Sequence, residues 1–396
     1  MRSALVLLLL AALPAVAENQ LQQLISDAIA RGESHLRLPP GEMRVDSRVY
    51  VHGADGLTIS GPGTTIVFTD PLDAGFMLDN CSRVTLRGFT VDCDPLPFTQ
   101  GTIVSISEDR SEWEFEVHEG YPALSEPYLA PQAYVYDPAT GRIRRGAPDI
   151  YPSSVEALSE RRGRMRLDGR TPGVELVEVG DLIVLNIRDG AGIFMHLCSD
   201  LRLEGVTMLA CPGMAFIGRY LSGDNVFRRL TVRPGPLPEG ATQPRLMSAA
   251  GDALNIAYSA RGPLIERCRF RAMGDDSINL HGPTFPVCAV EGSEIVLGRP
   301  YEGEPYERMV AAGDVLHGHR QGDFAIVGEG EIVRFERADG TEQWRERVQE
   351  AWPKVEVTRG SFFRVRLREA LPIEAGDWVT IPATGTHGFV IRDCEF

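Results

Sequence analysis

Two short segments that carry carboxylates repeat each other along the chain. Asp252-Ala253-Leu254-Asn255-Ile256 recurs 24 residues later as Asp276-Ser277-Ile278-Asn279-Leu280, and Asp275 stands directly before the second copy. In a parallel β-helix one coil takes roughly 20 to 30 residues, and strands of neighbouring coils lie about 4.8 Å apart. The spacing therefore predicts that Asp252 and Asp276 lie on adjacent coils, close enough to act together.

Three carboxylates gathered at one place are suited to the hydrolysis of a glycosidic bond. One protonated carboxyl group donates to the leaving oxygen, and one carboxylate activates water or attacks the anomeric carbon. Crowding separates the protonation of such groups, so that a neutral acid and an ionised base coexist near neutral pH. We therefore predict that Asp252, Asp275 and Asp276 are catalytic. The alternatives are a hydrogen-bonded Gly-Asp-Asp turn and a calcium site, although no acidic loop here resembles a calcium motif.

Five polar residues are candidates for contact with a substrate: Asn255, Asn279, His281, Asp94 and Gln100. The two asparagines could equally form an ordinary ladder between coils, and the histidine could be a simple hydrogen-bonding residue. Asp94 and Gln100 belong to a polar segment over residues 92–101 that either lines the same site or forms a proline-stiffened turn.

Strict alternation along a strand raises a difficulty for the aspartates. If Leu254 and Ile278 face the interior, Asp252 and Asp276 share their parity and would also point inward. A carboxylate buried in an apolar core costs too much free energy. The sequence therefore predicts a bend between each aspartate and the strand that follows it.

The elements that position these residues are almost all short strands. Apolar residues at helical spacing over residues 21–29, with Asn19 as N-cap, predict one short amphipathic helix. Alternating strands separated by Gly and Pro follow without intervening helices. Such a helix would cover the open end of a β-solenoid, which otherwise exposes apolar residues and unpaired strand edges.

An internal repeat supports a solenoid. Residues 81–91 match residues 198–208 almost position for position, and related segments follow at 226–232, 265–270 and 391–396. The alternation within each segment is that of a strand with one face inside. The chain is therefore predicted to be all-β.

The seven cysteines admit two interpretations. Four cysteines recur at matching positions of the repeat: Cys81, Cys198, Cys268 and Cys394. A small apolar side chain at such a position suits an inward-facing ladder. This favours packing over disulfide bridging. Cys81 and Cys93 are the pair best placed to form a bridge if any does.

Two stretches interrupt the repeat and are too long for turns. Each is rich in strands, and each ends on a similar phrase, Glu178-Val179-Gly180-Asp181 in the first and Glu374-Ala375-Gly376-Asp377 in the second. This predicts two related small β-barrels inserted into the solenoid. The predicted organisation is a signal peptide over 1–17, coils over 18–101, a barrel over 102–191, central coils with the site over 192–282, a second barrel over 283–386 and a further coil over 387–396.

The ends and the charge of the chain bound its location and partners. A basic start, a short apolar run and a small-residue exit over residues 1–17 predict a secretory signal peptide, and no run is long enough for a transmembrane helix. We expect an exported protein, periplasmic or extracellular. A formal net charge of -15 opposes binding to nucleic acid. The repeat stops at Phe396 within a coil, so we expect a truncated chain; the sequence leaves the oligomeric state open.

These residues resemble glycoside hydrolase family 110, the exo-acting α-1,3-galactosidases. The resemblance rests on Asp252 followed by Asp275-Asp276 within Gly-Asp-Asp-Ser-Ile-Asn-Leu-His-Gly, on the segment over residues 94–101, and on the two insertions. It implies a right-handed, pectate-lyase-like parallel β-helix and an inverting hydrolase without cofactor or metal. By position, Asp252 would be the general acid, and Asp275 with Asp276 would hold and deprotonate water. The implied partner is an oligosaccharide or glycan that contains α-galactoside.

Two other functions compete with this one. Polygalacturonases of family 28 also place an Asp before an Asp-Asp pair on a β-helix. Here, however, His281-Gly282 follows the pair within the same strand segment rather than on a later coil, and the basic Arg-Ile-Lys motif of that family is absent. A secreted carbohydrate-binding solenoid, with structural aspartates, is the non-enzymatic alternative.

Overall fold

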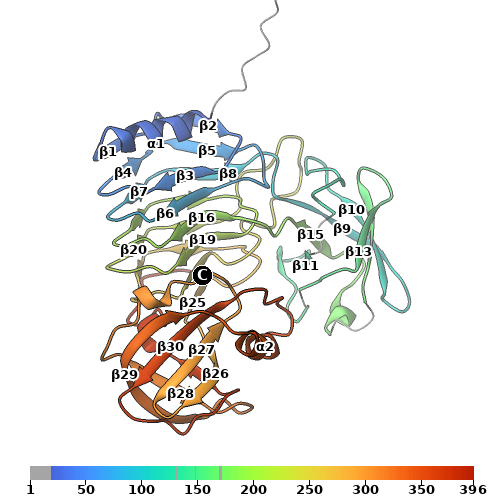
Figure 1. Cartoon of the computed structure of the whole chain (residues 1–396). Helices are drawn as coiled ribbons and strands as arrows, with labels where there is room; N and C mark the ends of the chain where they lie inside the picture. The colour runs from blue at the N-terminus through green and yellow to red at the C-terminus, as the bar shows by residue number, and fades with distance from the viewer. Residues whose placement is uncertain (1–18, 130–131, 148, 169–171) are drawn as a thin grey trace, which may run out of the picture.

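The chain forms a stack of coils with two insertions. The computed structural model describes residues 19–129, 132–147, 149–168 and 172–396, so the predicted signal peptide lies outside the described residues. Figure 1 shows the stacked coils, with the first insertion beside them and the second at one end. The fold is the predicted parallel β-helix.

Each coil contributes one strand to each of three parallel sheets. The first sheet contains β1 (His35–Arg37), β4 (Thr58–Ser60), β7 (Thr85–Arg87), β17 (Arg202–Glu204), β20 (Val226–Arg228), β23 (Leu264–Glu266) and β32 (Val390–Arg392). The second contains β2 (Gly41–Val45), β5 (Thr64–Phe68), β8 (Thr90–Cys93), β18 (Thr207–Met208), β21 (Thr231–Val232) and β24 (Arg269–Phe270). The third contains β3 (Val49–His52), β6 (Phe76–Asp79), β16 (Ala191–His196), β19 (Met214–Arg219), β22 (Leu254–Ala257) and β25 (Ile278–His281).

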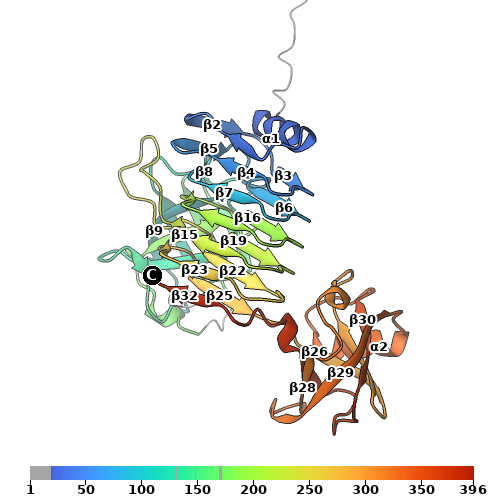
Figure 2. The ribbon, with the colours of Figure 1, turned by 90° about the vertical axis from the view of Figure 1, so that its left-hand side faces the viewer.

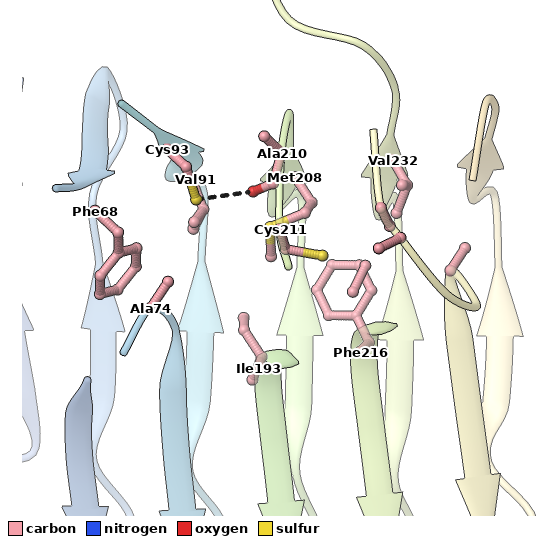
Figure 3. Close-up of a cluster of buried hydrophobic side chains, with 14 of the residues drawn as sticks. Phe68, Ala74, Val91, Cys93, Ile193, Met208, Ala210, Cys211, Phe216 and Val232 are labelled. Atoms are coloured by element: carbon pink, nitrogen blue, oxygen red, sulfur yellow. Dashed lines mark hydrogen bonds between the residues drawn. The ribbon is translucent and has the colours of Figure 1, made fainter. Parts of the chain in front are cut away.

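The interior of the coils is filled by the inward residues of these strands. Phe68, Phe76 and Phe216 are almost fully buried, and Figure 3 shows Phe68 and Phe216 with Cys93 and Cys211 in the apolar interior of successive coils. The rings of Phe68 and Phe76 meet edge to face, with centroids 6.0 Å apart. This packing fixes the register of the coils, because a one-residue slip would turn every inward side chain outward.

The predicted helix is present and covers the first coil (Figure 2). Helix α1 spans Gln20–Ala30, and the side chain of Asn19 accepts a hydrogen bond from the backbone N–H of Gln22 at 3.0 Å. Leu21, Ile25 and Ala28 are buried. The N-cap satisfies a backbone donor that the first turn leaves unpaired. No helix in the described ranges is long and apolar enough to span a bilayer.

The cysteines pack as free thiols, as predicted, but in two ladders rather than one. All seven are free, so Cys81 and Cys93 form no bridge. Cys81 and Cys198 stack at one corner of the coil, where the backbone N–H of Cys81 points to Cys198 Sγ at 3.4 Å. Cys268 and Cys394 stack at another corner, after β23 and β32. The sequence did not distinguish the two corners, because a Cys follows a short strand at each of them.

The first insertion is an antiparallel sheet with two edges, which corrects the expectation of a barrel. Its elements are β9 (Phe98–Ile106), β10 (Glu112–Val117), β11 (Gln132–Asp137), β12 (Arg142–Ile143), β13 (Ser154–Ala157), β14 (Arg162–Arg166), η1 (Val174–Leu176) and β15 (Leu182–Asn186). In the described part of the chain the strand order is β12-β11-β15-β9-β10-β14-β13. Strand β9 pairs with β15 from Phe98 onward, so the insertion begins before its predicted start at residue 102.

The second insertion is a closed barrel, as predicted. It contains β26 (Phe285–Glu291), β27 (Glu294–Arg299), η2 (Tyr306–Arg308), β28 (Val315–His319), β29 (Ile326–Ala338), α2 (Glu342–Ala351), β30 (Ser361–Leu367), β31 (Trp378–Thr380) and η3 (Pro382–Thr384). The strands close in the order β26-β27-β30-β29-β28-β31. Helix α2, capped by the Thr341 side chain, was not predicted.

The shared closing phrase of the insertions folds the same way twice. The backbone N–H of Glu178 donates to Asp181 Oδ2 at 2.8 Å, and that of Glu374 donates to Asp377 Oδ2 at 3.0 Å. Gly180 and Gly376 have φ of 98° and 104°, a conformation that favours glycine. These matching turns support the predicted kinship of the two insertions at their last strands.

Candidate active site

The three predicted carboxylates come together at the start of β22 and β25. These adjacent strands pair in register, with Leu254 opposite Ile278 and Asn255 opposite Asn279. One carboxylate oxygen from each of Asp252, Asp275 and Asp276 lies within 4.8 Å of the other two. The repeat of 24 residues therefore does place the aspartates on neighbouring coils.

A bend before each strand turns the aspartates out of the core, as predicted. The backbone bends at Ala253 and at the equivalent Ser277. Asp252 Oδ2 accepts a hydrogen bond from Asn255 Nδ2 at 2.6 Å, on the outer face of the sheet. Leu254, which would share parity with Asp252 in a straight strand, points into the core.

Each asparagine binds the aspartate of its own coil. Asp276 Oδ2 accepts from Asn279 Nδ2 at 3.1 Å, which repeats the contact between Asn255 and Asp252. The two asparagines occupy paired positions, but their amide N–H groups are directed to carboxylates rather than to each other. Each Asp-x-x-Asn unit thus fixes the orientation of one carboxyl group.

Burial separates Asp252 from the other two aspartates. Its exposed fraction is 2 %, whereas Asp275 and Asp276 are exposed. Burial raises the pKa of Asp252, the Asn255 hydrogen bond opposes the rise, and the charges of Asp275 and Asp276 add to it. One carboxyl group is therefore disposed to stay protonated beside two solvated carboxylates, which is the division of labour that acid–base catalysis needs.

The first insertion supplies an arginine to the site that sequence reasoning missed. One terminal nitrogen of Arg188 donates to Asp275 Oδ2 at 2.7 Å, and the other donates to the Tyr134 hydroxyl at 3.1 Å. Asp149, from the same insertion, has a pKa raised first by burial and then by the charge of Asp275. Nothing in the local sequence around Arg188 or Asp149 points to the carboxylates, because the insertion brings them there.

His281 lies on the same outer face, next to a tyrosine. It pairs with Ala257 at the end of β22, and its ring meets that of Tyr258 edge to face at 5.3 Å. Burial lowers the pKa of His281, so the ring is neutral at neutral pH. A neutral imidazole keeps one acceptor and one donor nitrogen, which suits contact with a hydroxyl group.

Asp94 and Gln100 make contacts of other kinds. Asp94 Oδ2 accepts from Arg44 of β2 at 2.8 Å on the surface of the coils. Gln100 is buried, and its amide binds the backbone of a long loop between coils, at Pro244 O (2.9 Å) and Leu246 N (3.0 Å). Gln100 thereby ties the first insertion to that loop.

Chemically, the site offers two possibilities. The three oxygen atoms are close enough to bind one hard cation together, although exposed acidic groups often cluster without one. One buried carboxyl group beside two exposed ones also matches the machinery of glycoside hydrolysis. The unequal burial of the three groups fits the second possibility, in which one carboxyl group is the acid and the others act on water.

The fold and the site together define a parallel β-helix that carries three clustered carboxylates on adjacent coils. No family model matches the chain. Over 251 residues it is 26% identical to alpha-1,3-galactosidase B of Bacteroides thetaiotaomicron, covering 59% of this chain and 39% of that protein. Over 269 residues it is 22% identical to alpha-1,3-galactosidase A of Bacteroides fragilis, covering 65% and 43%. These relatives support the resemblance to family 110.

These similarities cover only part of each relative. The chain spans about two fifths of the length of the curated relatives it matches. Among solved structures, the Gp54 tailspike of Acinetobacter baumannii bacteriophage AP22, in complex with a capsular saccharide, is 9% identical over 91% of this chain and 92% of its own. Its TM-score of 0.15 is too low to support an inference about this protein.

Proposed function

We propose that this protein is an exported exo-glycosidase that hydrolyses terminal α-1,3-linked galactose from oligosaccharides or glycans with inversion of configuration. The observation that carries the proposal is the trio of Asp252, Asp275 and Asp276, with one oxygen of each within 4.8 Å of the others and only Asp252 buried. The galactoside specificity is suggested by the relatives, which are named alpha-1,3-galactosidases.

In this proposal the acid is Asp252. Its raised pKa favours the protonated carboxyl group, which donates its proton to the leaving glycosidic oxygen. Asn255 holds one carboxyl oxygen in place through its amide N–H. The acid acts while the bond between the anomeric carbon and the leaving oxygen breaks.

The base is Asp275, assisted by Asp276. One of their oxygens removes a proton from the attacking water while that water forms its bond to the anomeric carbon. Asn255, Asn279 and His281 bind sugar hydroxyls, whereas Asp94 and Gln100 hold other parts of the fold and take no part in binding. No cofactor takes part in these steps.

Inversion is the part of the proposal that geometry constrains most. Inverting enzymes hold their carboxyl groups roughly 6.5 to 9.5 Å apart, and retaining enzymes about 5 to 5.5 Å. The 4.8 Å limit applies to one oxygen from each group. The distance between two carboxyl groups averaged over all their oxygens is longer than this closest approach. Asp275, one residue away from the stacked position, is the partner that leaves more room for water.

The test is product analysis with a panel of substrates. Purified protein, with any continuation that the gene encodes, is incubated with α-1,3-, α-1,4- and α-1,6-galactobiose and with polygalacturonate, and products are followed by NMR. We expect galactose from the α-1,3-linked disaccharide alone, appearing first as the β-anomer. First appearance of the α-anomer would contradict inversion. Cleavage of polygalacturonate would favour a pectinase, and binding without turnover would favour a carbohydrate-binding solenoid.

A further inference from the structure

The first insertion reaches the carboxylate cluster through one side chain. Arg188 lies in the connection between β15 and β16, where the insertion returns to the coils. Its guanidinium bridges Asp275 Oδ2 at 2.7 Å and the Tyr134 hydroxyl at 3.1 Å. The side chains of Arg188 and Asp275 are 30% and 38% exposed, so the pair is partly shielded from water.

The far end of this bridge is rigid. Tyr134 belongs to β11 and is 1% exposed, and its hydroxyl also accepts a hydrogen bond from the buried Gln132 side chain at 2.9 Å. An arginine held only by a surface carboxylate keeps most of its rotamer freedom, and such an ion pair contributes little to stability. Arg188 is instead held at both ends, because a buried tyrosine fixes one nitrogen.

The Gly-Asp-Asp turn is packed directly against the same tyrosine. A Cβ atom placed on Gly274 would lie 2.8 Å from Tyr134 Cε2 and 2.6 Å from the carbonyl oxygen of Ala250. The coils and the first insertion also share one continuous hydrophobic core. The insertion therefore sits at a fixed distance from the turn that carries Asp275.

The three carboxylates differ in what holds them. Asp252 and Asp276 accept from the amides of Asn255 and Asn279 within their own coils. Asp275 accepts from Arg188 at Oδ2 and from the backbone N–H of Asp276 at Oδ1, at 3.1 Å. Asp275 thus has both oxygens fixed, and its strongest contact comes from the insertion.

We propose that Arg188 is a positioning residue for Asp275, through which the first insertion completes the active site. It rests on the proposed function, because Asp275 is there the base that activates water. The guanidinium fixes the plane of the Asp275 carboxylate so that one oxygen faces the attacking water. Arg188 does not touch the substrate in this role.

Kinetics of Arg188 variants test the proposal. Displacing a reacting group by about 1 Å can cost roughly 100-fold in rate, so we expect Arg188→Met to lower kcat by about that factor and to change KM little. Arg188→Lys, which keeps the charge without the two-pronged geometry, should fall between. Added guanidinium ion, at concentrations that leave the wild type unaffected, should partly restore Arg188→Ala. Arg261→Met, which removes an exposed arginine paired with Asp224 at 2.6 Å, is the matched control.

A double-mutant comparison separates positioning from general stabilisation. If Arg188 acts through Asp275, Arg188→Met should cause no further loss in an Asp275→Asn background. Multiplicative losses in the two variants would overturn the proposal, as would an Arg188→Met protein with the kcat of the wild type.

Hydrogen exchange gives a readout that does not depend on turnover. Peptides that cover residues 272–280 should exchange faster in Arg188→Met than in the wild type and in Arg261→Met, because the Asp275 turn loses its anchor. If the wild type cleaves none of the substrates, the proposed function fails and exchange alone decides the anchoring role. Unchanged exchange would then overturn it.

Discussion

The carboxyl group of Asp252 occupies a position that favours its uncharged form. It is 2% exposed, and burial together with two neighbouring carboxylates raises its pKa above the ordinary value of about 3.9. A folded state that binds a proton more tightly than the unfolded state loses stability as pH rises. The contribution of Asp252 is therefore most favourable below the ordinary pKa and is lost as pH rises through the raised one.

This linkage predicts how Asp252→Asn affects stability. The asparagine can still accept the Asn255 hydrogen bond but carries no charge, so the variant should match the wild type in acid and exceed it at neutral pH. Urea unfolding of both proteins at two pH values measures the difference in the free energy of unfolding. Asp224→Asn, at an exposed aspartate, should show no such gain. A variant less stable than the wild type at neutral pH would contradict the account.

At the residue scale, sequence predicted what is local and missed what is distant. Asp252, Asp276 and their asparagines could be predicted because the repeat contains the same Asp-x-x-Asn unit twice. Arg188 binds Asp275 across 87 residues of sequence. That contact depends on how the insertion docks on the coils, and no spacing within the chain encodes it.

The closing turns of the insertions are the element whose chemistry is most fully specified. In each, a glycine at positive φ precedes an aspartate whose Oδ2 caps the backbone N–H three residues earlier. Removing an acceptor from a buried donor costs roughly 1 to 3 kcal/mol. Both aspartates are buried and both hydrogen bonds are partly buried, so a cost near the lower end of this range is expected for each.

We therefore expect Asp377→Ala to lower the free energy of unfolding of the second insertion by an amount near the lower end of the range of about 1 to 3 kcal/mol. Three of the four tryptophans, Trp344, Trp352 and Trp378, lie in that insertion, so their fluorescence reports on it during urea unfolding. Asp181→Ala removes the equivalent acceptor in the first insertion, together with an ion pair to Arg144, and should shift the tryptophan transition less. Equal shifts in the two variants would argue against separate turns with separate effects.

Elements were predictable where a repeat or a phrase marks them. The coils, the capping helix and the closed second barrel follow from alternation, helical spacing and the Gly-Asp phrase. Helix α2 was missed because its sequence is mostly polar and buries only Val348. The first insertion was expected to close, but closure depends on pairing between β12 and β13, two short strands whose partners the sequence does not specify.

At the scale of the whole molecule, the two insertions relate to the coils differently. The first shares a continuous core with the coils, while the second has a core of its own around Phe285, Tyr306 and Phe363. Figure 2 shows the second insertion leaving the stack after β25. The repeat reveals where insertions interrupt the coils, but docking surfaces that are spread over many segments decide which core they join.

The coils are held by packing rather than by disulfides, and the number of free thiols tests this. All seven cysteines are free, and six are buried. Thiol titration of protein unfolded without reductant should find seven reactive groups, and reductant should leave the thermal unfolding temperature unchanged. A count of five would reveal one bridge, for which Cys81 and Cys93 were the expected partners.

Galactose release from α-1,3-galactobiose, compared between the wild type and Asp252→Asn, is the decisive experiment for the proposed hydrolase. General acid catalysis contributes roughly 10²- to 10⁴-fold, so we expect release by the wild type and a loss of that order in a variant at least as stable at neutral pH. Equal release by both proteins would contradict the assignment of Asp252 as the acid. No release by the folded wild type would contradict the galactosidase itself.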